Sequence, residues 1–333
     1  MSGLKVIFGI VVFYVCIVAL HFSLNRDPRI ASATPSTLRI GYLPVTCHLT
    51  CPVTDWINKR IKSAGNDLKP VRFSGFPEMK EAFLSDHLDA AFLLAPLSMS
   101  LIQQGAEAKV VFLGHRDGTA MVVHKDSEIR SVRDLVGKKI AIPSRYSNQF
   151  LMIFKGLKDQ GLGLNDVKLV EMPPPDMPAA LQTKSVDAIT SGEPWMAKSE
   201  IEGFGRVLYQ AKDIWPGFIS CVLVVRERLI RESPERVQQL VDGIARSGKW
   251  LDADPENRMN AADNIGRDYY KQDPKLLRHV LSKPPDRVTY SQLRLARSEF
   301  AVIENLAFEA GLLKQPIAFE QYADARFSDR VPQ

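Results

Sequence analysis

A chain of 333 residues, 45% of them apolar and 24% charged, can bury a substantial core, which excludes a disordered protein and predicts about two domains. The formal charge is +5, but the sequence contains no run of basic residues interleaved with aromatic residues. Nucleic-acid binding is therefore not predicted. The chain also has no internal repeat and no low-complexity segment. Globular binding proteins, carriers and enzymes remain as the classes to weigh.

The N-terminus carries an apolar run, residues 6–22, that approaches the roughly 20 residues needed to span a bilayer. Lys5 precedes this run, so we expect a signal anchor whose positive end stays in the cytoplasm and which leaves residues 34–333 on the other side of the membrane. A cleaved signal peptide is the alternative, because residues 31–33 read Ala-Ser-Ala, like a signal-peptidase site. Residues 1–33 are therefore interpreted as an anchor or signal segment with a linker.

From residue 38 short apolar runs alternate with amphipathic stretches, a pattern typical of parallel sheets covered by helices. An α/β fold is therefore predicted. The expected strands are residues 38–42, 71–73, 90–94, 109–113, 120–124, 139–142, 167–171, 187–190, 205–208 and 221–225.

Beyond these strands the pattern becomes helical. Ser233, Asp254 and Asp273 each stand directly before a proline, which places an N-cap ahead of the first helical position three times. We expect a further helix from Ser291, and a capped helix between Ser131 and the glycine at position 137.

The segment 191–218 opens with Ser-Gly-Glu-Pro-Trp and closes with Asp-Ile-Trp-Pro-Gly-Phe. Glu193, Trp195 and Trp215 therefore combine a carboxylate and two large aromatic rings with turn residues, a composition typical of ligand clefts. Structural hydrogen bonding by Glu193 and core packing by the two tryptophans are the alternatives.

Loops that follow the expected strands supply further candidates, because ligands bind at strand ends in such sheets. Ser147 and its neighbours lie at a probable helix N-terminus, which favours an anion, although an ordinary N-cap is the alternative. A turn at Asp117 and a solvated Arg145 are likewise open alternatives. The complete set of predicted ligand contacts is Thr46, His48, Phe76, Pro96, Arg116, Asp117, Arg145, Tyr146, Ser147, Gln149, Glu193, Trp195 and Trp215.

Cys47 and Cys51 flank His48 in one short loop. Three interpretations stay open: a disulfide between the two cysteines, a metal site of Cys47, His48 and Cys51, or inert thiols. Cys221 lies in an apolar run and is expected to be a buried small residue. No cofactor is predicted beyond this possible metal ion.

Residues 173–177, Pro-Pro-Pro-Asp-Met, followed by Glu193, Pro194 and Trp195, resemble the solute-binding proteins of nitrate, bicarbonate, sulfonate and taurine ABC importers, most closely the nitrate/bicarbonate branch. Residues 131–141 resemble the entry into the second domain of type II periplasmic binding proteins. The resemblance implies that fold, with two α/β domains around a hinged cleft. It further implies a first domain of residues 34–124 and 222–333, a second domain of residues 125–221, and chain crossings near residues 123–125 and 221–224.

The resemblance also implies an extracytoplasmic, periplasmic protein that works with an ABC permease and ATPase, binds as a monomer and makes or breaks no bond. One departure limits the ligand. The branch carries His and then Lys after the Trp-Pro-Gly turn, whereas residues 218–221 read Phe-Ile-Ser-Cys. We therefore expect a small polar or anionic solute captured by hinge closure, without assigning nitrate or bicarbonate.

Two other classes stay open. A membrane-tethered metal-binding or sensor protein would use Cys47, His48 and Cys51. An enzyme related to the pyrimidine synthases would need a nucleophile or a metal with an orienting partner.

Overall fold

The computed structural model describes residues 37–61 and 68–332. Within these ranges, no helix combines the length and the apolar character needed to cross a membrane. The predicted anchor, residues 6–22, and the alternative cleavage site at residues 31–33 lie outside the described residues.

All ten predicted strands are present, together with two short strands that the sequence pattern did not predict, β5 and β12. The strands are β1 (Leu38–Tyr42), β2 (Leu68–Arg72), β3 (Ala90–Leu94), β4 (Ala108–Leu113), β5 (Arg116–Asp117), β6 (Thr119–His124), β7 (Lys139–Ile142), β8 (Lys168–Glu171), β9 (Ala188–Gly192), β10 (Gly205–Gln210), β11 (Cys221–Arg226) and β12 (Val288–Thr289).

Helices fill most of the intervals between strands and form the C-terminal part of the chain. The α-helices are α2 (Thr50–Ile61), α3 (Phe76–Leu84), α4 (Ala95–Gln103), α5 (Asn148–Lys158), α6 (Met177–Gln182), α7 (Trp195–Ile201), α8 (Ala211–Ile214), α9 (Glu227–Glu232), α10 (Pro234–Ala253), α11 (Pro255–Ile265), α12 (Pro274–Ser282), α13 (Arg297–Glu309), α14 (Phe319–Tyr322) and α15 (Arg326–Asp329). Short 3-10 turns are η2 (Thr46–His48), η3 (Arg133–Leu135), η4 (Leu164–Asp166) and η5 (Pro174–Asp176), and η6 (Gly266–Tyr270) is a π-helical turn.

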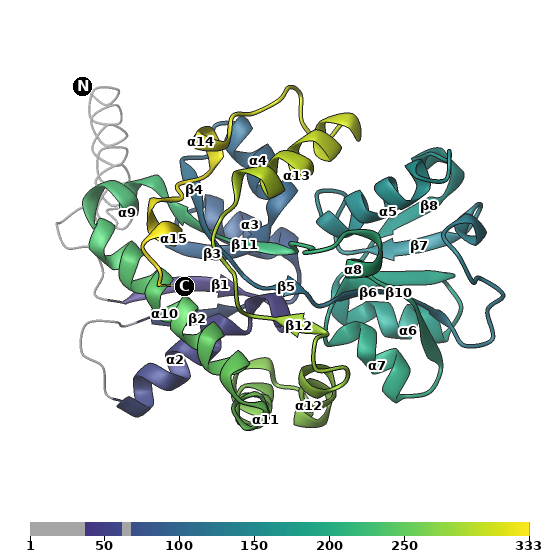
Figure 1. Cartoon of the computed structure of the whole chain (residues 1–333), viewed down its shortest axis with the longest axis horizontal. Coiled ribbons are helices and arrows are strands. Elements are labelled where there is room, and N and C mark those ends of the chain that lie inside the picture. Colours follow the sequence, from purple (N-terminus) through teal and green to yellow (C-terminus); the bar gives the residue numbers. More distant parts are fainter. Residues whose placement is uncertain (1–36, 62–67, 333) are drawn as a thin grey trace, which may run out of the picture. The chain divides into compact units, whose positions relative to one another are not determined.

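The strands form two five-stranded sheets, on the left and right of Figure 1. The first has the order β2-β1-β3-β11-β4, and the second has the order β10-β6-β9-β7-β8. Each is mixed, because β11 runs antiparallel to β3 and β4, and β6 runs antiparallel to β9 and β10. A mixed α/β fold is thus confirmed.

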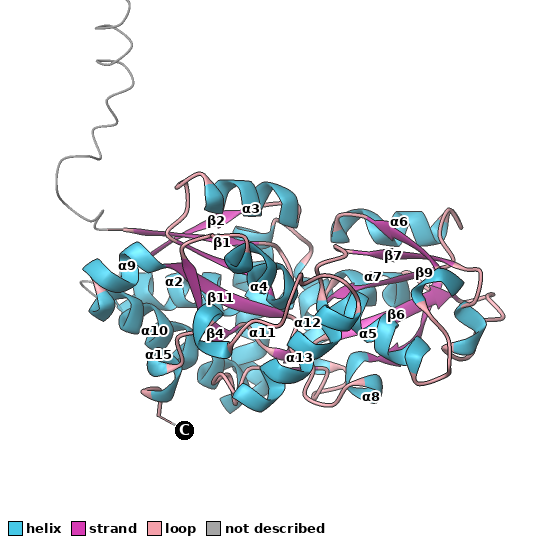
Figure 2. Ribbon diagram, turned by 90° about the horizontal axis from the view of Figure 1, so that it is seen from above, coloured by secondary structure: helices cyan, strands magenta, loops and turns pink. Residues whose placement is uncertain are grey.

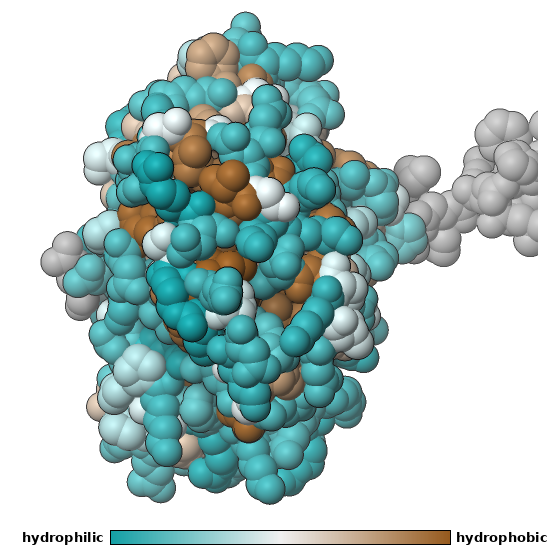
Figure 3. Space-filling view, turned by 90° about the vertical axis from the view of Figure 1, so that its right-hand side faces the viewer, coloured by the Kyte–Doolittle hydropathy of each residue, from teal (hydrophilic) through white to brown (hydrophobic). Residues whose placement is uncertain are grey.

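Helices cover both faces of the second sheet, as Figures 1 and 2 show. Along β6, Ala120 and Val122 pack into the cluster beneath α6 and α7, while Met121 and Val123 pack into the core that contains α5. This strict alternation is what a strand covered on both sides requires. The surface on this side of the molecule is mostly hydrophilic (Figure 3), as amphipathic covering helices predict.

The first crossing between the sheets was expected near residues 123–125, but β6 already belongs to the second sheet. The chain therefore crosses at residues 114–118, where Asp117 and Gly118 both have a φ of 62° and turn the backbone between the two apolar runs. The return crossing ends before β11, which pairs with β3 and β4 in the first sheet. The predicted domain ranges themselves stay a prediction.

The two crossing segments lie side by side. Asp117 N–H donates to Phe218 O at 2.8 Å, and Arg116 forms a β-bridge with Ile219. On its other side β5 pairs with β12, through the register Val288 to Asp117. Three separate parts of the chain therefore meet where the sheets are joined.

The three predicted proline-led helix starts are confirmed, because α10, α11 and α12 begin at Pro234, Pro255 and Pro274. The helix expected from Ser291 begins only at Arg297. The intervening backbone pairs with β4 instead, since Leu113 N–H donates to Leu293 O at 3.2 Å. The helix expected after Ser131 is limited to η3, a single turn.

Candidate functional site

A group of buried polar side chains lies where the two sheets meet, and we call it the central polar cluster. Each member exposes at most 1% of its surface. Its members are Thr46, Cys47 and His48 on η2, His115 after β4, Thr119 on β6, Asn148 and Gln149 at the start of α5, and Ser220 and Cys221 at the start of β11.

Hydrogen bonds connect the members across the junction. Gln149 Nε2 donates to Thr119 Oγ1 at 3.2 Å and to Ser220 Oγ at 3.1 Å. Thr46 Oγ1 lies 3.3 Å from His115 Nε2, and Asn148 Nδ2 donates to the Ile219 carbonyl. The cluster therefore joins first-sheet loops, the crossing segments and a second-sheet helix.

Several polar atoms of this cluster are buried without a hydrogen-bond partner: His48 Nε2, His115 Nδ1, Asn148 Oδ1 and Gln149 Oε1. Leaving one such atom unpaired costs about 1–3 kcal/mol, and native proteins keep few of them. Their concentration at one junction identifies this place as the candidate ligand site.

The ring of His48 is held in a defined orientation. Leu43 N–H donates to His48 Nδ1 at 2.7 Å, so the neutral ring carries its proton on Nε2. Phe92 and Phe76 pack against the ring, with centroids at 5.3 and 6.0 Å. His48 therefore presents an N–H group to the cluster.

Cys47 lies beside Cys221, with 3.2 Å between the two sulfur atoms. Burial alone would raise the pKa of the Cys47 thiol, but a hydrogen bond with Cys221 and the rings of His48 and His115 bring it well below its usual value. Burial raises the pKa of Cys221 well above its usual value.

This arrangement bears on the three open interpretations of the cysteines: it contradicts the disulfide, changes the membership of the metal group and is consistent with free thiols. Cys47, Cys51 and Cys221 are free thiols, so the predicted Cys47–Cys51 disulfide is absent from the described structure. Among the described residues, the group that could hold a metal is Cys47, His48 and Cys221, whose ligand atoms all lie within 4.8 Å of one another. Cys221 replaces Cys51 because strand pairing brings β11 next to the end of β4, whereas Cys51 begins α2.

Glu193 is fully buried, but both of its carboxylate oxygens already have protein partners. Oε1 accepts from Arg287 Nη1 at 2.8 Å, and Oε2 accepts from Ala197 N–H at 2.8 Å. Its backbone carbonyl also accepts from Thr46 N–H at 2.6 Å, which ties β9 to η2. Glu193 therefore makes structural hydrogen bonds, the alternative that the sequence left open beside a ligand contact.

Phe76 and Tyr146 meet in an outer pocket of about 280 Å³ between α3, α4 and the loop before α5. Because Phe76 also packs on His48, this pocket lies next to the central polar cluster. Ser147 forms the N-cap of α5 by accepting from Phe150 N–H at 3.1 Å. Arg145, largely exposed, lies 3.5 Å from Glu171.

The other predicted contacts are dispersed. Arg116 makes two hydrogen bonds to Glu299, at 2.6 and 2.9 Å. Asp117 occupies the tight turn of the crossing, and burial raises its pKa. Pro96 is buried in α4, Trp195 begins α7 with its Nε1 unpartnered, and Trp215 packs on Phe218 at 5.8 Å. The structure does not gather these five into the central polar cluster.

Three residues that contribute to the central polar cluster or to the contacts of Glu193 were absent from the set of predicted ligand contacts: His115, Cys221 and Arg287. The sequence places His115 directly after a strand, and Cys221 at the start of one, which are weak local indications. Arg287 has no local indication, because it meets Glu193 across 94 positions of the chain.

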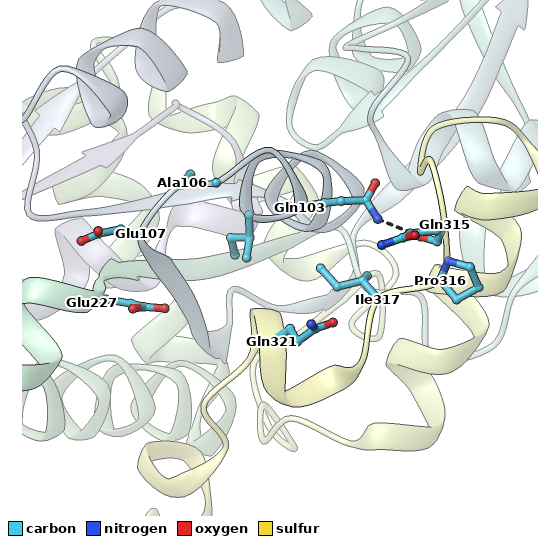
Figure 4. Close-up of a pocket in the computed structure, with 10 residues that line it drawn as sticks. Gln103, Ala106, Glu107, Glu227, Gln315, Pro316, Ile317 and Gln321 are labelled. Atoms are coloured by element: carbon cyan, nitrogen blue, oxygen red, sulfur yellow. Dashed lines mark hydrogen bonds between the residues drawn. The ribbon is translucent and has the colours of Figure 1, made fainter.

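A larger surface pocket, about 350 Å³, lies between the end of α4, the start of α9, residues 315–317 and α14 (Figure 4). Gln103 Nε2 closes one end by donating to Gln315 O at 2.8 Å. None of its described lining side chains holds a buried polar atom without a partner. We therefore place the candidate site at the central polar cluster.

Two mixed sheets joined by paired crossing segments, with a polar cluster at their junction, define a periplasmic-binding-protein-like fold. The ligand-binding component of an ABC-type import system from Staphylococcus aureus, solved with zinc bound, superimposes with a TM-score of 0.80 at 25% identity over 89% of this chain and 99% of that one. The alkanesulfonate-binding protein SsuA from Xanthomonas axonopodis gives 0.70 at 19% identity, covering 87% and 98%. The nitrate-binding protein NrtA from Synechocystis gives 0.77 at 14% identity, covering 89% and 86%.

Residues 31–266 match the NMT1-like family, and the chain belongs to it. Relatives in sequence include a putative aliphatic sulfonates-binding protein of Bacillus subtilis, 25% identical over 74% of each chain. A putative binding protein of Brucella abortus is 23% identical over 73% of this chain and 75% of that one. The predicted relationship to sulfonate- and nitrate-type binding proteins is confirmed. The desulfurization enzyme DSZB shares the fold, with a TM-score of 0.62 at 19% identity over 88% of this chain and 97% of that one.

Proposed function

We propose that this chain is the extracytoplasmic solute-binding component of an ABC importer, which captures a small polar solute between its two sheets and delivers it to a permease. The central polar cluster carries the proposal, because both sides of the junction contribute buried polar atoms that lack protein partners. The sulfonate- and nitrate-type relatives support the transport role.

The mechanism is closure of the two sheets on the solute. Residues 46–48 come from the first-sheet side and Gln149 from α5 on the second-sheet side. A solute that hydrogen-bonds both groups binds the closed form more tightly than the open one, and that difference in affinity shifts the population toward closure. No bond is made or broken, so the chain acts as a binding protein rather than an enzyme.

The proposal extends to location and partners. A permease and an ATPase would receive the solute, and the chain would work as a monomer on the periplasmic face of the inner membrane. Residues 6–22 would anchor it there, or be removed as a signal peptide. The two domains would be divided at the crossing segments.

Thermal unfolding against a solute panel tests this function. The panel contains nitrate, bicarbonate, sulfonates, taurine, pyrimidines and flavins. A ligand at 100 times its Kd adds about 2.7 kcal/mol to the free energy of unfolding, which raises the midpoint by roughly 5–10 °C. Small-angle scattering should show compaction with the same solute.

A matched pair of variants locates the binding. Gln149→Met should abolish the shift, while Gln103→Met, in the surface pocket of Figure 4, should leave it intact. A shift that survives Gln149→Met, or a bound solute that produces no compaction, would contradict closure around the central polar cluster.

A further inference from the structure

The charge of the central polar cluster does not suit an oxyanion. Arg287 is the one buried arginine or lysine among the described residues, and its Nη atoms contact Glu193 and Glu200. The cluster itself offers the Cys47 and Cys221 sulfurs and the free amide oxygens of Asn148 and Gln149. An anion enclosed there would have no cationic side chain other than the histidines, so the cost of removing it from water would be poorly offset.

The backbone is shaped to bring the two sulfurs together. Gly114 N–H donates to Cys221 O at 2.9 Å, and a Cβ at position 114 would overlap the Cys47 carbonyl oxygen and approach Cys221 O to 3.2 Å. From the second sheet, a Cβ at Gly192 would lie 3.8 Å from Cys47 Sγ. Glycine at position 114 is therefore required for the convergence of the two cysteine segments. At position 192 a Cβ would make only ordinary van der Waals contact with Val45 and Cys47, so the second sheet already lies against the sulfur there.

The thiols are suited to a soft cation. The Cys47 and Cys221 sulfurs are buried and lie 3.2 Å apart, and thiolates are the ligands that Cu(I) prefers. A monovalent ion bound by both sulfurs would displace the proton of each thiol, giving a bis-thiolate complex and two released protons. Two thiolates that hold a metal at about 2.3 Å in a near-linear arrangement lie about 4.5 Å apart, so the sulfurs must separate by more than about 1 Å from 3.2 Å.

The orientation of His48 selects among soft ions. Its Nδ1 accepts the Leu43 N–H, so its Nε2 carries a proton and offers no lone pair to a metal. His48 therefore has an unpartnered Nε2–H beside the sulfurs, available as a hydrogen-bond donor to a bound thiolate, and is a positioning residue rather than a third ligand. Zn(II), which takes four ligands in tetrahedral geometry, is poorly served, whereas Cu(I) accepts thiolate ligation alone.

We infer that the solute held at this site is Cu(I) or a similarly soft monovalent cation, bound by the thiolates of Cys47 and Cys221 and enclosed when the second sheet closes over them. This inference rests on the proposed solute-binding function, because closure is what delivers Gly192 and the α5 amides to the ion.

The test uses the purified full chain, reduced and kept free of oxygen. Cu(I), Zn(II) and nitrate are titrated separately, and metal content is measured after gel filtration. Cys47→Ser and Cys221→Ser remove one ligand each, and Cys51→Ser is the matched control, since Cys51 is a buried free thiol outside the cluster. The unmodified chain and Cys51→Ser should retain one Cu(I) per molecule. Each ligand variant should bind it at least tenfold more weakly, and Zn(II) should not be retained.

X-ray absorption of the copper-loaded, unmodified chain gives a second reading that does not depend on a variant folding. Two sulfur ligands and no nitrogen would confirm the inference. Retention of Zn(II) that His48→Gln abolishes would overturn it, as would Cu(I) binding unaffected by both ligand variants, or a Cys47–Cys221 disulfide that persists under the reducing conditions.

Scattering separates this inference from the proposed function. Compaction with an oxyanion or organic solute, without Cu(I) retention, would overturn the inference and support solute capture. A two-sulfur Cu(I) site without compaction by copper or by any panel member would support the metal site and overturn capture by closure.

Discussion

Replacing Glu193 with glutamine should remove a large pH dependence of stability. Burial raises the pKa of Glu193 to about 7 from its ordinary 4.5, although the charge of Arg287 and the Ala197 N–H lower it. Because the folded state holds the proton more tightly than the unfolded chain, this stabilisation is complete below about pH 4.5 and is lost as pH rises through 7. A difference of that size corresponds to about 3 kcal/mol.

Urea unfolding at pH 5 and pH 8 measures the effect. Between these values the free energy of unfolding of the unmodified protein should fall by about 2.5 kcal/mol more than that of Glu193→Gln, whose amide does not titrate, because pH 5 already lies above the pKa of the unfolded chain. The variant also loses a hydrogen bond, but that loss is the same at both pH values. Glu200→Gln, which changes the other carboxylate on Arg287, should retain most of the dependence. Equal pH dependence in the unmodified protein and Glu193→Gln would refute the reasoning.

Two further changes test how the cluster is held. Ser147→Ala removes the N-cap of α5 and should lower the free energy of unfolding by about 1 kcal/mol, measured by urea denaturation; an unchanged midpoint would exclude the cap as a source of stability. Gly114→Ala should cost about 1–3 kcal/mol and weaken ligand binding, because the new methyl group overlaps the Cys47 carbonyl oxygen. Gly163→Ala, where a Cβ meets nothing within 4 Å, is its control, and equal melting temperatures for the two variants would contradict this account.

Local patterns in the sequence were sufficient for most of the fold. Each of the ten predicted strands is present among the described residues, and a proline after Ser233, Asp254 or Asp273 marked a helix start. The failures have a common cause. Residues 291–296 satisfy a helical pattern but pair with the end of β4, and the two-residue strands β5 and β12 are too short to produce a pattern. In both cases a partner distant in sequence decides the conformation.

The site was less predictable for the same reason. Thr46, His48 and Gln149 could be proposed because they follow strand ends, and all three lie in the central polar cluster. The partner of Cys47, however, is 174 positions away, and the partner of Glu193 is 94 positions away. The spacing of Cys47 and Cys51 suggested the wrong pair, because closeness along the chain was the one geometric guide that the sequence provides.

The paired strands β5 and β12 link the junction of the two sheets to the C-terminal region. Arg116 fastens this strand pair to the C-terminal region, through Gln292 O at 2.7 Å and the carboxylate of Glu299. The strands β5 and β12 and the segment at Ile219 are thus held together, and α13 is held to them through Glu299. Under the proposed closure, a movement of one sheet against the other would therefore also move α13.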